Sequence, residues 1–426
     1  MIKILFITHY TTLFGANRSL VELINGLKEY GYDLRLLSPE TGPVTEKLKD
    51  SINKFYIIPF NRICEEKIDN KDKLIEQFIN QTKSIYELIK DDKIDLIYSN
   101  SSVIGTGALI SSMLNIPHIW HFRELTEEHY NYKYIFDKEF LKSLYSETEE
   151  IIVNSKYLAN SLYLKDFSVI YNSVGYKNEI IKQSNDTRNK DQNLLCSVGL
   201  LHPTKYHNEA ILALSSLHKY FPQMQLVIAG IGSEEAYLRQ VARICNVHES
   251  VHFVGFVNEP LQLMKQAFLT LVCSRNEAFG RVTIESMSIK TPVVAYEQGG
   301  TREIIENYKN GIFYRNNYTD LANKILLLKA NPELYSNISE QGHNSVVDNY
   351  TNEIYINKIN CIIKKALENE IKSKPVTKSL TDNHKQNKIY HSIIEKRKYL
   401  KFSIITPSFN QGKYIEQNIL SVLNQK

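Results

Sequence analysis

Short apolar runs alternate with longer amphipathic segments along most of this chain, and this alternation constrains the fold more than any other feature. The runs have the length and the branched or aromatic residues of buried β-strands, and the segments between them have helical periodicity. Strands that alternate with helices form parallel sheets covered on both faces. In the first half the expected strands are residues 2–7, 33–37, 55–58, 96–99, 118–121, 150–153 and 168–171.

The pattern restarts in the second half, after a polar stretch. The strands expected there are residues 194–198, 225–229, 251–253, 269–273, 293–295 and 312–314. We therefore predict an α/β protein with two Rossmann-like, doubly wound domains, residues 1–174 and 193–350, joined by a hinge linker at 175–192. Ligands of such sheets bind beyond the carboxyl ends of the strands, so we expect the site in the crevice between the domains.

The end of the chain differs in character. A helical pattern at residues 351–370 is expected to return to the first domain, and residues 371–400 are predicted to be a polar linker. Residues 401–426 predict one strand, a turn and one amphipathic helix. Because one strand and one helix cannot bury a core alone, we expect a short strand–helix fragment there.

The charge and the cysteines argue against several classes of protein. The formal net charge of +4 is too small to indicate a nucleic-acid partner, although it is compatible with weak attraction to phosphates or anionic lipid. The five cysteines include no CxxC pair, so neither a disulfide framework nor a zinc site is indicated. No signal peptide is expected from the first residues, and no apolar run approaches the roughly 18–20 residues of a membrane span. We expect a cytoplasmic protein without a metal site.

Residues 269–296, LTLVCSRNEAFGRVTIESMSIKTPVVAY, carry the most chemical information. They predict a buried strand, a loop with Glu277 and Gly280, and a helix from about residue 281. Free N–H groups and the positive dipole end at a helix start suit a phosphate, and a glycine lets the backbone approach a ligand. Glu277 and Glu285 can accept hydrogen bonds from sugar and ribose hydroxyls. Residue types alone leave open that Glu277 caps the helix and Glu285 is a solvated surface residue.

The segment EAFGRVTIESMSIKTPVVA, in which Glu277 and Glu285 stand eight positions apart, resembles the donor-site signature of family 4 glycosyltransferases. These enzymes have the GT-B fold, two facing Rossmann-like domains. Gly299-Gly300 and Glu303 fit a further element of the family, and the resemblance covers roughly residues 1–370. It implies the following donor-binding residues: Glu277 for sugar hydroxyls, Glu285 for the ribose, the backbone of Phe279, Gly280 and Arg281 for the sugar and diphosphate, and Gly300.

The segment SVGLLHPTKYHNEAILAL, from Ser197, resembles the family's diphosphate-binding element. Lys205 fits its lysine, whose charge stabilises the leaving diphosphate. Leu200 stands where the family has an arginine, and Tyr206 stands where it has a glycine. Either Arg281 or another cation is expected to substitute, or turnover is weak. Without the family context, Lys205 reads as a solvated loop lysine.

Three further residues are assigned from the resemblance. Val257, in VGFVNEP, matches the segment whose backbone meets the nucleobase. Gly15, in HYTTLFGANRSL, matches a glycine loop that faces the diphosphate, although an ordinary strand–helix turn is the alternative. Arg123, in HFREL, stands at a position near the transferred sugar where many members have histidine, and we expect it to stabilise negative charge on phosphate or sugar.

The resemblance implies a retaining glycosyltransferase of the hexosyl type that uses a nucleotide-diphosphate sugar as co-substrate and needs no cofactor. A saccharide or lipid-linked acceptor in surface polysaccharide synthesis is the expected partner, with peripheral association at the inner membrane. The stretch HYNYKYIFDKEFLKSLYSE, from His129, is read either as an interfacial patch or as a packed helix with a solvated lysine face. A non-catalytic sugar-nucleotide-binding scaffold and a nucleotide-sugar epimerase or hydrolase remain alternatives.

The last segment, SIITPSFNQGKYIEQNILSVLNQ from Ser403, resembles the opening strand, turn and helix of family 2 glycosyltransferases, which have the GT-A fold. It lacks the metal-binding acidic motif of that family. We interpret it as the truncated start of a second transferase domain that carries no chemistry.

Overall fold

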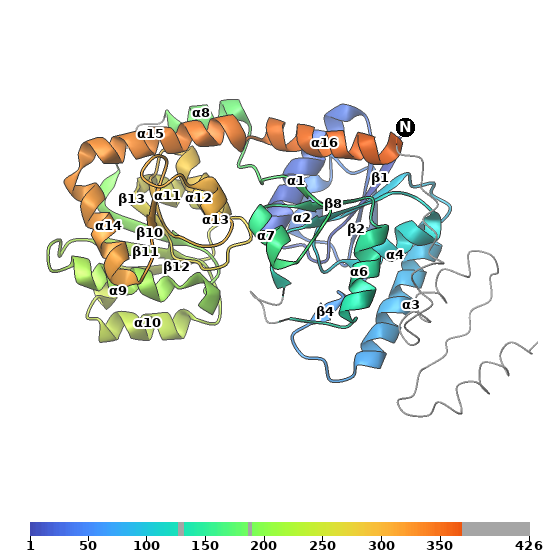
Figure 1. Ribbon diagram of the computed structural model, residues 1–426, viewed down its shortest axis with the longest axis horizontal. Coiled ribbons are helices and arrows are strands. Elements are labelled where there is room, and N and C mark those ends of the chain that lie inside the picture. Colours follow the sequence, from blue (N-terminus) through green and yellow to red (C-terminus); the bar gives the residue numbers. More distant parts are fainter. Residues whose placement is uncertain (127–131, 186–189, 369–426) are drawn as a thin grey trace, which may run out of the picture.

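The computed structural model describes residues 1–126, 132–185 and 190–368. The predicted linker at 371–400 and the family 2 resemblance at 401–426 lie outside these residues. Two α/β domains stand side by side, and the last two helices cross from one to the other (Figure 1).

The first domain is built on a parallel sheet in the order β3-β2-β1-β5-β6-β8-β9. Its strands are β1 Lys3–Ile7, β2 Asp33–Ser38, β3 Lys54–Ile57, β5 Leu96–Ser99, β6 His118–Phe122, β8 Glu150–Val153 and β9 Ser168–Val169. Each overlaps an expected strand. The first domain also holds an antiparallel pair that we did not predict, β4 Cys64–Glu65 with β7 Lys133–Tyr134.

The second domain repeats the design with a parallel sheet in the order β12-β11-β10-β13-β14-β15. Its strands are β10 Asp191–Val198, β11 Gln225–Ala229, β12 Val251–Gly255, β13 Ala267–Val272, β14 Val293–Tyr296 and β15 Ile312–Tyr314. The predicted α/β architecture with two doubly wound domains is confirmed. Apolar residues fill both faces of these strands because helices cover both sides of a parallel sheet.

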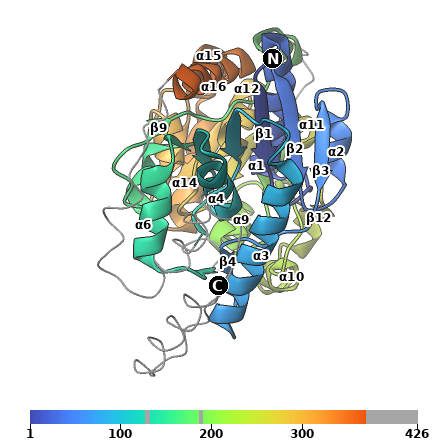
Figure 2. The same ribbon diagram turned by 90° about the vertical axis from the view of Figure 1, so that its right-hand side faces the viewer.

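Helices connect the strands and cover the sheets. In the first domain they are α1 Gly15–Leu27, α2 Pro43–Leu48, α3 Lys71–Ile89, α4 Gly105–Leu114, α6 Lys138–Glu147 and α7 Lys156–Ser161. The later helices are α8 Lys177–Ser184, α9 His207–Leu217, α10 Glu235–Ile244, α11 Pro260–Gln266, α12 Arg281–Ser288, α13 Thr301–Ile304, α14 Tyr318–Ala330, α15 Pro332–Asn349 and α16 Asn352–Glu368. Short 3₁₀ turns lie at Lys28–Tyr30, Pro203–Lys205 and His248–Ser250. Figure 2 looks onto the first domain, with α3 and α4 toward the viewer.

The helix α16 packs on the first domain although it follows the second in the chain (Figure 1). Tyr355, Ile356 and Ile359 are buried in the same core as α1 and the first sheet. At Gly26 of α1 the side chain of Ile356 fills the space that a β-carbon would need. This packing brings the hydroxyl of Tyr355 within hydrogen-bond distance of Arg123 in the first domain.

The segment 175–192 differs from the predicted linker because it contains α8 and the start of β10. Ile180 of α8 is buried in the core that Ile284 and Met287 of α12 also form. Ile181, the other apolar residue of α8, is exposed, so the sequence shows no helical apolar face there. The helix α8 therefore belongs to the packing of the second domain.

Of the two interpretations of the aromatic stretch from His129, the structure supports a packed helix for the residues that it describes. Ile135, Phe136, Phe140 and Leu144 are all buried in the core of the first domain. Residues 127–131 lie outside the described part of the chain. Over that described part, no helix combines the length and the apolarity needed to cross a bilayer.

Candidate functional site

A cavity of about 730 Å³ lies between the two domains, at the carboxyl ends of both sheets. Loops that follow β1 and β6 line it from the first domain, and loops that follow β10 and β13 line it from the second. Nine of the ten predicted site residues line this one cavity: Gly15, Arg123, Lys205, Val257, Glu277, Phe279, Gly280, Arg281 and Glu285. Gly300 does not.

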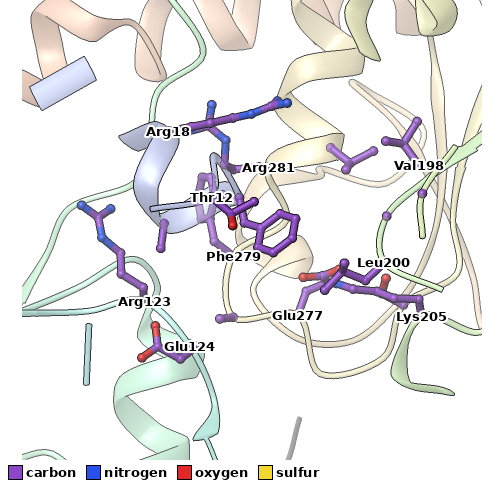
Figure 3. Close-up of a pocket in the computed structure, with 18 of the residues that line it drawn as sticks. Thr12, Arg18, Arg123, Glu124, Val198, Leu200, Lys205, Glu277, Phe279 and Arg281 are labelled. Atoms are coloured by element: carbon purple, nitrogen blue, oxygen red, sulfur yellow. The ribbon is translucent and has the colours of Figure 1, made fainter. Parts of the chain in front are cut away.

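Lys205 and Glu277 face each other across the second-domain side of the cavity (Figure 3). Lys205 ends the 3₁₀ turn after β10, and Glu277 lies in the loop after β13. These strands are neighbours in the sheet, so their carboxyl ends bring the two side chains together. The Lys205 ammonium donates to Glu277 Oε1 at 2.5 Å. Glu277 therefore pairs with a cation and does not cap α12.

Glu285 lies on the first turns of α12 and is buried, so it is not the solvated surface residue of the alternative interpretation. Its Oε1 accepts from Arg281 Nε at 3.2 Å and lies 3.7 Å from Arg18 Nη1. Arg281 also donates to Ser19 Oγ at 2.7 Å and pairs with Glu22 at 3.2 Å. Ser19 and Glu22 are on α1, so Arg281 bridges the domains.

The charge of Arg281 is secure in this setting. Burial by itself would lower the pKa of the guanidinium, but the carboxylates of Glu22 and Glu285 outweigh it and raise the pKa above its usual value. Arg18, at the start of α1, is a second cation of the cavity wall and donates to the carbonyl of Asn258 at 3.2 Å. Sequence reasoning missed Arg18, although its place three residues after Gly15 was a usable signal.

Gly280 is the residue before α12 and has a φ of 106°, a left-handed conformation that side chains disfavour. A β-carbon there would lie 2.7 Å from Thr301 Oγ1. Gly300 acts behind this loop, because its N–H donates to the Glu277 carbonyl at 2.7 Å. Phe279 is buried, and its ring stacks on Tyr171 with centroids 5.7 Å apart. The loop that contains Glu277 is thus held in place by its contacts with Gly300, Thr301 and Tyr171.

Gly280→Ala should destabilise the protein by about 1–3 kcal/mol, because it adds backbone strain and a contact that Thr301 must relieve. Gly15→Ala is the matched control, since its β-carbon would meet only Arg281 Cδ at 3.5 Å, an ordinary contact. Differential scanning fluorimetry of both variants measures the difference. Equal melting temperatures for the two variants would show that the loop adapts and that the left-handed glycine is dispensable for folding.

Arg123 lies in the cavity wall of the first domain, but its guanidinium is engaged by protein groups, unlike the sequence expectation. It donates to Asn100 Oδ1 at 2.9 and 3.0 Å, to Asn172 Oδ1 at 2.7 Å and to Tyr355 OH at 2.8 Å. Asn100 follows β5, Asn172 follows β9, and Tyr355 lies on α16. Arg123 therefore ties α16 to the edge of the first sheet.

The remaining predicted residues lie around the cavity. Val257 lines it beside Phe256, whose ring contacts Phe14 with centroids 6.4 Å apart, a contact between the domains. Leu200 also lines it, so the position where the family has arginine does face the cavity. Arg18 and Arg281 line the same cavity and are cations that can substitute for that arginine.

Glu303 joins the two domains beside the donor loop. Its carboxylate accepts from the N–H of Lys156 at 2.9 Å and of Tyr157 at 2.7 Å, at the start of α7. In addition, the hydroxyl of Ser155 donates to the carbonyl of Ala278. The loop with Glu277 is thus braced by the first domain as well as by the second.

The two halves of the chain match two family models. The model described as Glycosyltransferase Family 4 matches residues 15–175, and the model described as Glycosyl transferases group 1 matches residues 178–345. Both end before residue 401, so they lend no support to the family 2 interpretation of the last segment.

Two curated proteins that are similar to most of the chain are named as glycosyltransferases. An uncharacterized glycosyltransferase of Haemophilus influenzae is 25% identical over 355 residues, covering 79% of this chain and 92% of that protein. The UDP-Gal:alpha-D-GlcNAc-diphosphoundecaprenol alpha-1,3-galactosyltransferase of Escherichia coli is 21% identical over 384 residues, covering 84% and 95%. Among solved structures, HepE of Anabaena in complex with UDP matches with a TM-score of 0.69 and 20% identity, covering 85% of this chain and 100% of HepE. HepE has also been solved with UDP-glucose.

Proposed function

Because the chain belongs to the glycosyltransferases with the GT-B fold, we propose that it transfers a hexosyl group from a nucleotide-diphosphate sugar to a saccharide or a lipid-linked saccharide, with retention of anomeric configuration. The observation that carries the proposal is the convergence of Lys205, Glu277 and Glu285 on one cavity between the domains. Two carboxylates and a cation in a crevice suit a ligand with hydroxyls at both ends and a diphosphate between them.

The donor has a natural place among these groups. Lys205 and the first N–H groups of α12 bind the diphosphate, where the dipole of the helix adds to the lysine charge. Glu285 accepts hydrogen bonds from the ribose, and Glu277 accepts them from the transferred sugar. Without a donor, the charges of Lys205 and Glu277 neutralise each other in an ion pair. An arriving diphosphate takes over Lys205, and Glu277 turns to the sugar hydroxyls.

Arg18 and Arg281 take the place of the family's missing arginine. Both line the cavity, and Arg281 keeps its charge through Glu22 and Glu285. HepE binds UDP and UDP-glucose, so we propose a uridine nucleotide as the donor's carrier, its base near Val257.

The reaction proceeds on one face of the donor sugar. The bond from the anomeric carbon to the diphosphate oxygen breaks, the acceptor oxygen forms a bond on the same face, and the acceptor proton passes to the departing diphosphate. Rate enhancement then comes from stabilising the leaving group and from holding the acceptor in place. We further propose that the enzyme acts in the cytoplasm in surface polysaccharide synthesis, where a lipid-linked acceptor brings it to the membrane surface.

Turnover of a panel of UDP-, GDP- and ADP-sugars by the wild type and by Glu277→Gln tests the proposal. We expect one donor to raise the melting temperature and to be consumed, with glycoside formed when saccharides are added. Glu277→Gln should lose about 10- to 100-fold of that activity, because a charged hydrogen-bond acceptor for the sugar is removed. The assay contains EDTA, since we propose that side chains bind the diphosphate without a metal ion. Activity that requires added Mg²⁺ would overturn that part.

A non-catalytic sugar-nucleotide-binding protein is the second candidate, because Leu200 leaves the cavity without the family's arginine. Donor binding without any turnover by the wild type would favour it. Release of free sugar, or formation of a second nucleotide sugar with no glycoside, would favour a hydrolase or an epimerase.

A further inference from the structure

The first-domain half of the cavity contains polar groups that the donor does not need. Glu124 and His9 both line it, and Figure 3 shows Glu124 on the opposite side from Lys205 and Glu277. His9 follows β1 and Glu124 follows β6, and between these strands lies β5. The carboxyl ends of three neighbouring parallel strands therefore build one wall.

Glu124 is held in a fixed orientation through one of its two oxygens. Oε1 accepts from the hydroxyl of Ser101, from Ser102 N at 3.0 Å and from Ser102 Oγ at 2.8 Å. Ser102 Oγ also contacts Thr126 Oγ1 at 3.1 Å, and the Ser101 carbonyl accepts from Trp120 Nε1 at 2.7 Å. Among the described residues, no hydrogen bond ends on Oε2 of Glu124.

His9 contributes a second polar atom without a protein partner among the described residues of the same wall. Its Nδ1 is buried and has no hydrogen-bond partner among the residues that the structure describes. Burial, with the nearby charge of Arg62, lowers the pKa of this imidazole to about 3, so the ring is neutral at physiological pH. A buried ring nitrogen without a partner is costly unless a ligand supplies one.

The rest of the wall suits a sugar ring more than a phosphate. Tyr132 and Phe60 present aromatic surface to the cavity. Arg62 lies over the Tyr132 ring at 4.7 Å and is paired with Glu65 at 3.4 Å. The charges of Arg62 and Glu65 cancel, and the charge of Arg123 in the same wall offsets that of Glu124, so the described part of the wall has no surplus cation for a phosphate.

We infer that Glu124 and His9 form the acceptor subsite and that it takes an uncharged pyranose ring, one hydroxyl of which donates to Glu124 Oε2. The ring lies against Tyr132 and Phe60, and a rotation of the His9 side chain lets the buried Nδ1 bond a neighbouring hydroxyl. This inference rests on the proposed function and names the acceptor class for the same cavity. Glu124 is a binding residue here, and the acceptor proton still leaves with the diphosphate.

Glu124→Gln separates this role from a structural one. The glutamine carbonyl can keep the bonds from Ser101 and Ser102, because an amide N–H cannot face Ser102 N–H. The amide nitrogen then replaces Oε2 in the cavity and has no lone pair to offer. Ligand-observed NMR on the full chain, with and without UDP, measures binding of octyl β-glucoside, octyl β-galactoside and octyl N-acetylglucosaminide.

The wild type should bind at least one of these glycosides, and Glu124→Gln should weaken that binding about five- to tenfold, the difference between a charged and a neutral acceptor. UDP affinity should stay within about twofold. Glu87→Gln, an exposed carboxylate of α3, is the matched control and should change neither affinity. His9→Leu should weaken the same glycoside without changing UDP affinity.

Unchanged glycoside affinity in Glu124→Gln would overturn the inference. So would a wild type that binds UDP but none of the glycosides, or a Glu124→Gln variant that loses UDP affinity in parallel, since Glu124 would then support the fold. Failure of the wild type to bind UDP speaks instead against the proposed uridine donor, and glycoside binding measured without UDP still tests the subsite.

Discussion

Replacing Lys205 with methionine should lower kcat for sugar transfer by about 10²–10³-fold, the usual effect of removing one group that stabilises a developing negative charge. Methionine keeps most of the apolar length of the side chain and removes the charge beside the diphosphate. Stability should change by no more than about 1 kcal/mol, because the Lys205–Glu277 pair is partly solvated. Steady-state release of nucleoside diphosphate measures the rate.

Lys219→Met is the control, because Lys219 lies exposed two residues after α9, in the same domain. It should leave kcat unchanged. A loss of less than about tenfold in Lys205→Met would contradict the assignment and would move the main charge on the diphosphate to Arg18 or Arg281.

Replacing Arg123 with methionine should destabilise the protein by about 2–4 kcal/mol. The substitution leaves Asn100, Asn172 and Tyr355 without their buried donor, and each unpaired buried group costs roughly 1–3 kcal/mol before the site relaxes. Because Tyr355 is on α16, the grip of that helix on the first domain should weaken first. Thermal unfolding together with limited proteolysis of α16 measures both effects.

Arg239→Met serves as the control for Arg123, since Arg239 makes only a pair with Glu235 and a contact with the Phe253 ring at the surface of α10 and should contribute no more than about 1 kcal/mol. An Arg123→Met variant of normal stability that has lost donor affinity would contradict the structural assignment. It would instead support the sequence-based expectation that Arg123 meets phosphate or sugar.

The strands were predictable because parallel sheets bury both faces, which leaves compact apolar runs such as residues 225–229 and 293–295. The helix α8 was not, because Ile180 alone among its residues is buried. The pair β4–β7 has two residues in each strand, too few for any periodicity, and its partners lie far apart in the sequence.

The second-domain side of the site was predictable because one short segment carries it, from Glu277 to Glu285. The first-domain side was not, because it depends on contacts between distant segments. The bridge from Arg281 to Glu22, the Arg123 network with Tyr355 and the alignment of His9 with Glu124 all require the tertiary fold. Gly300 shows the limit of reasoning from a motif. Its place in the family's Gly-Gly element suggested contact with the donor, whereas in the structure its N–H donates to the carbonyl of Glu277.

The most direct test of the central claim is a crystal structure of the full chain with UDP bound. The account predicts the nucleotide in the cavity between the domains, with its diphosphate within hydrogen-bond distance of the Lys205 ammonium and its ribose hydroxyls on Glu285. A nucleotide bound elsewhere, or one in the cavity that contacts neither side chain, would contradict it.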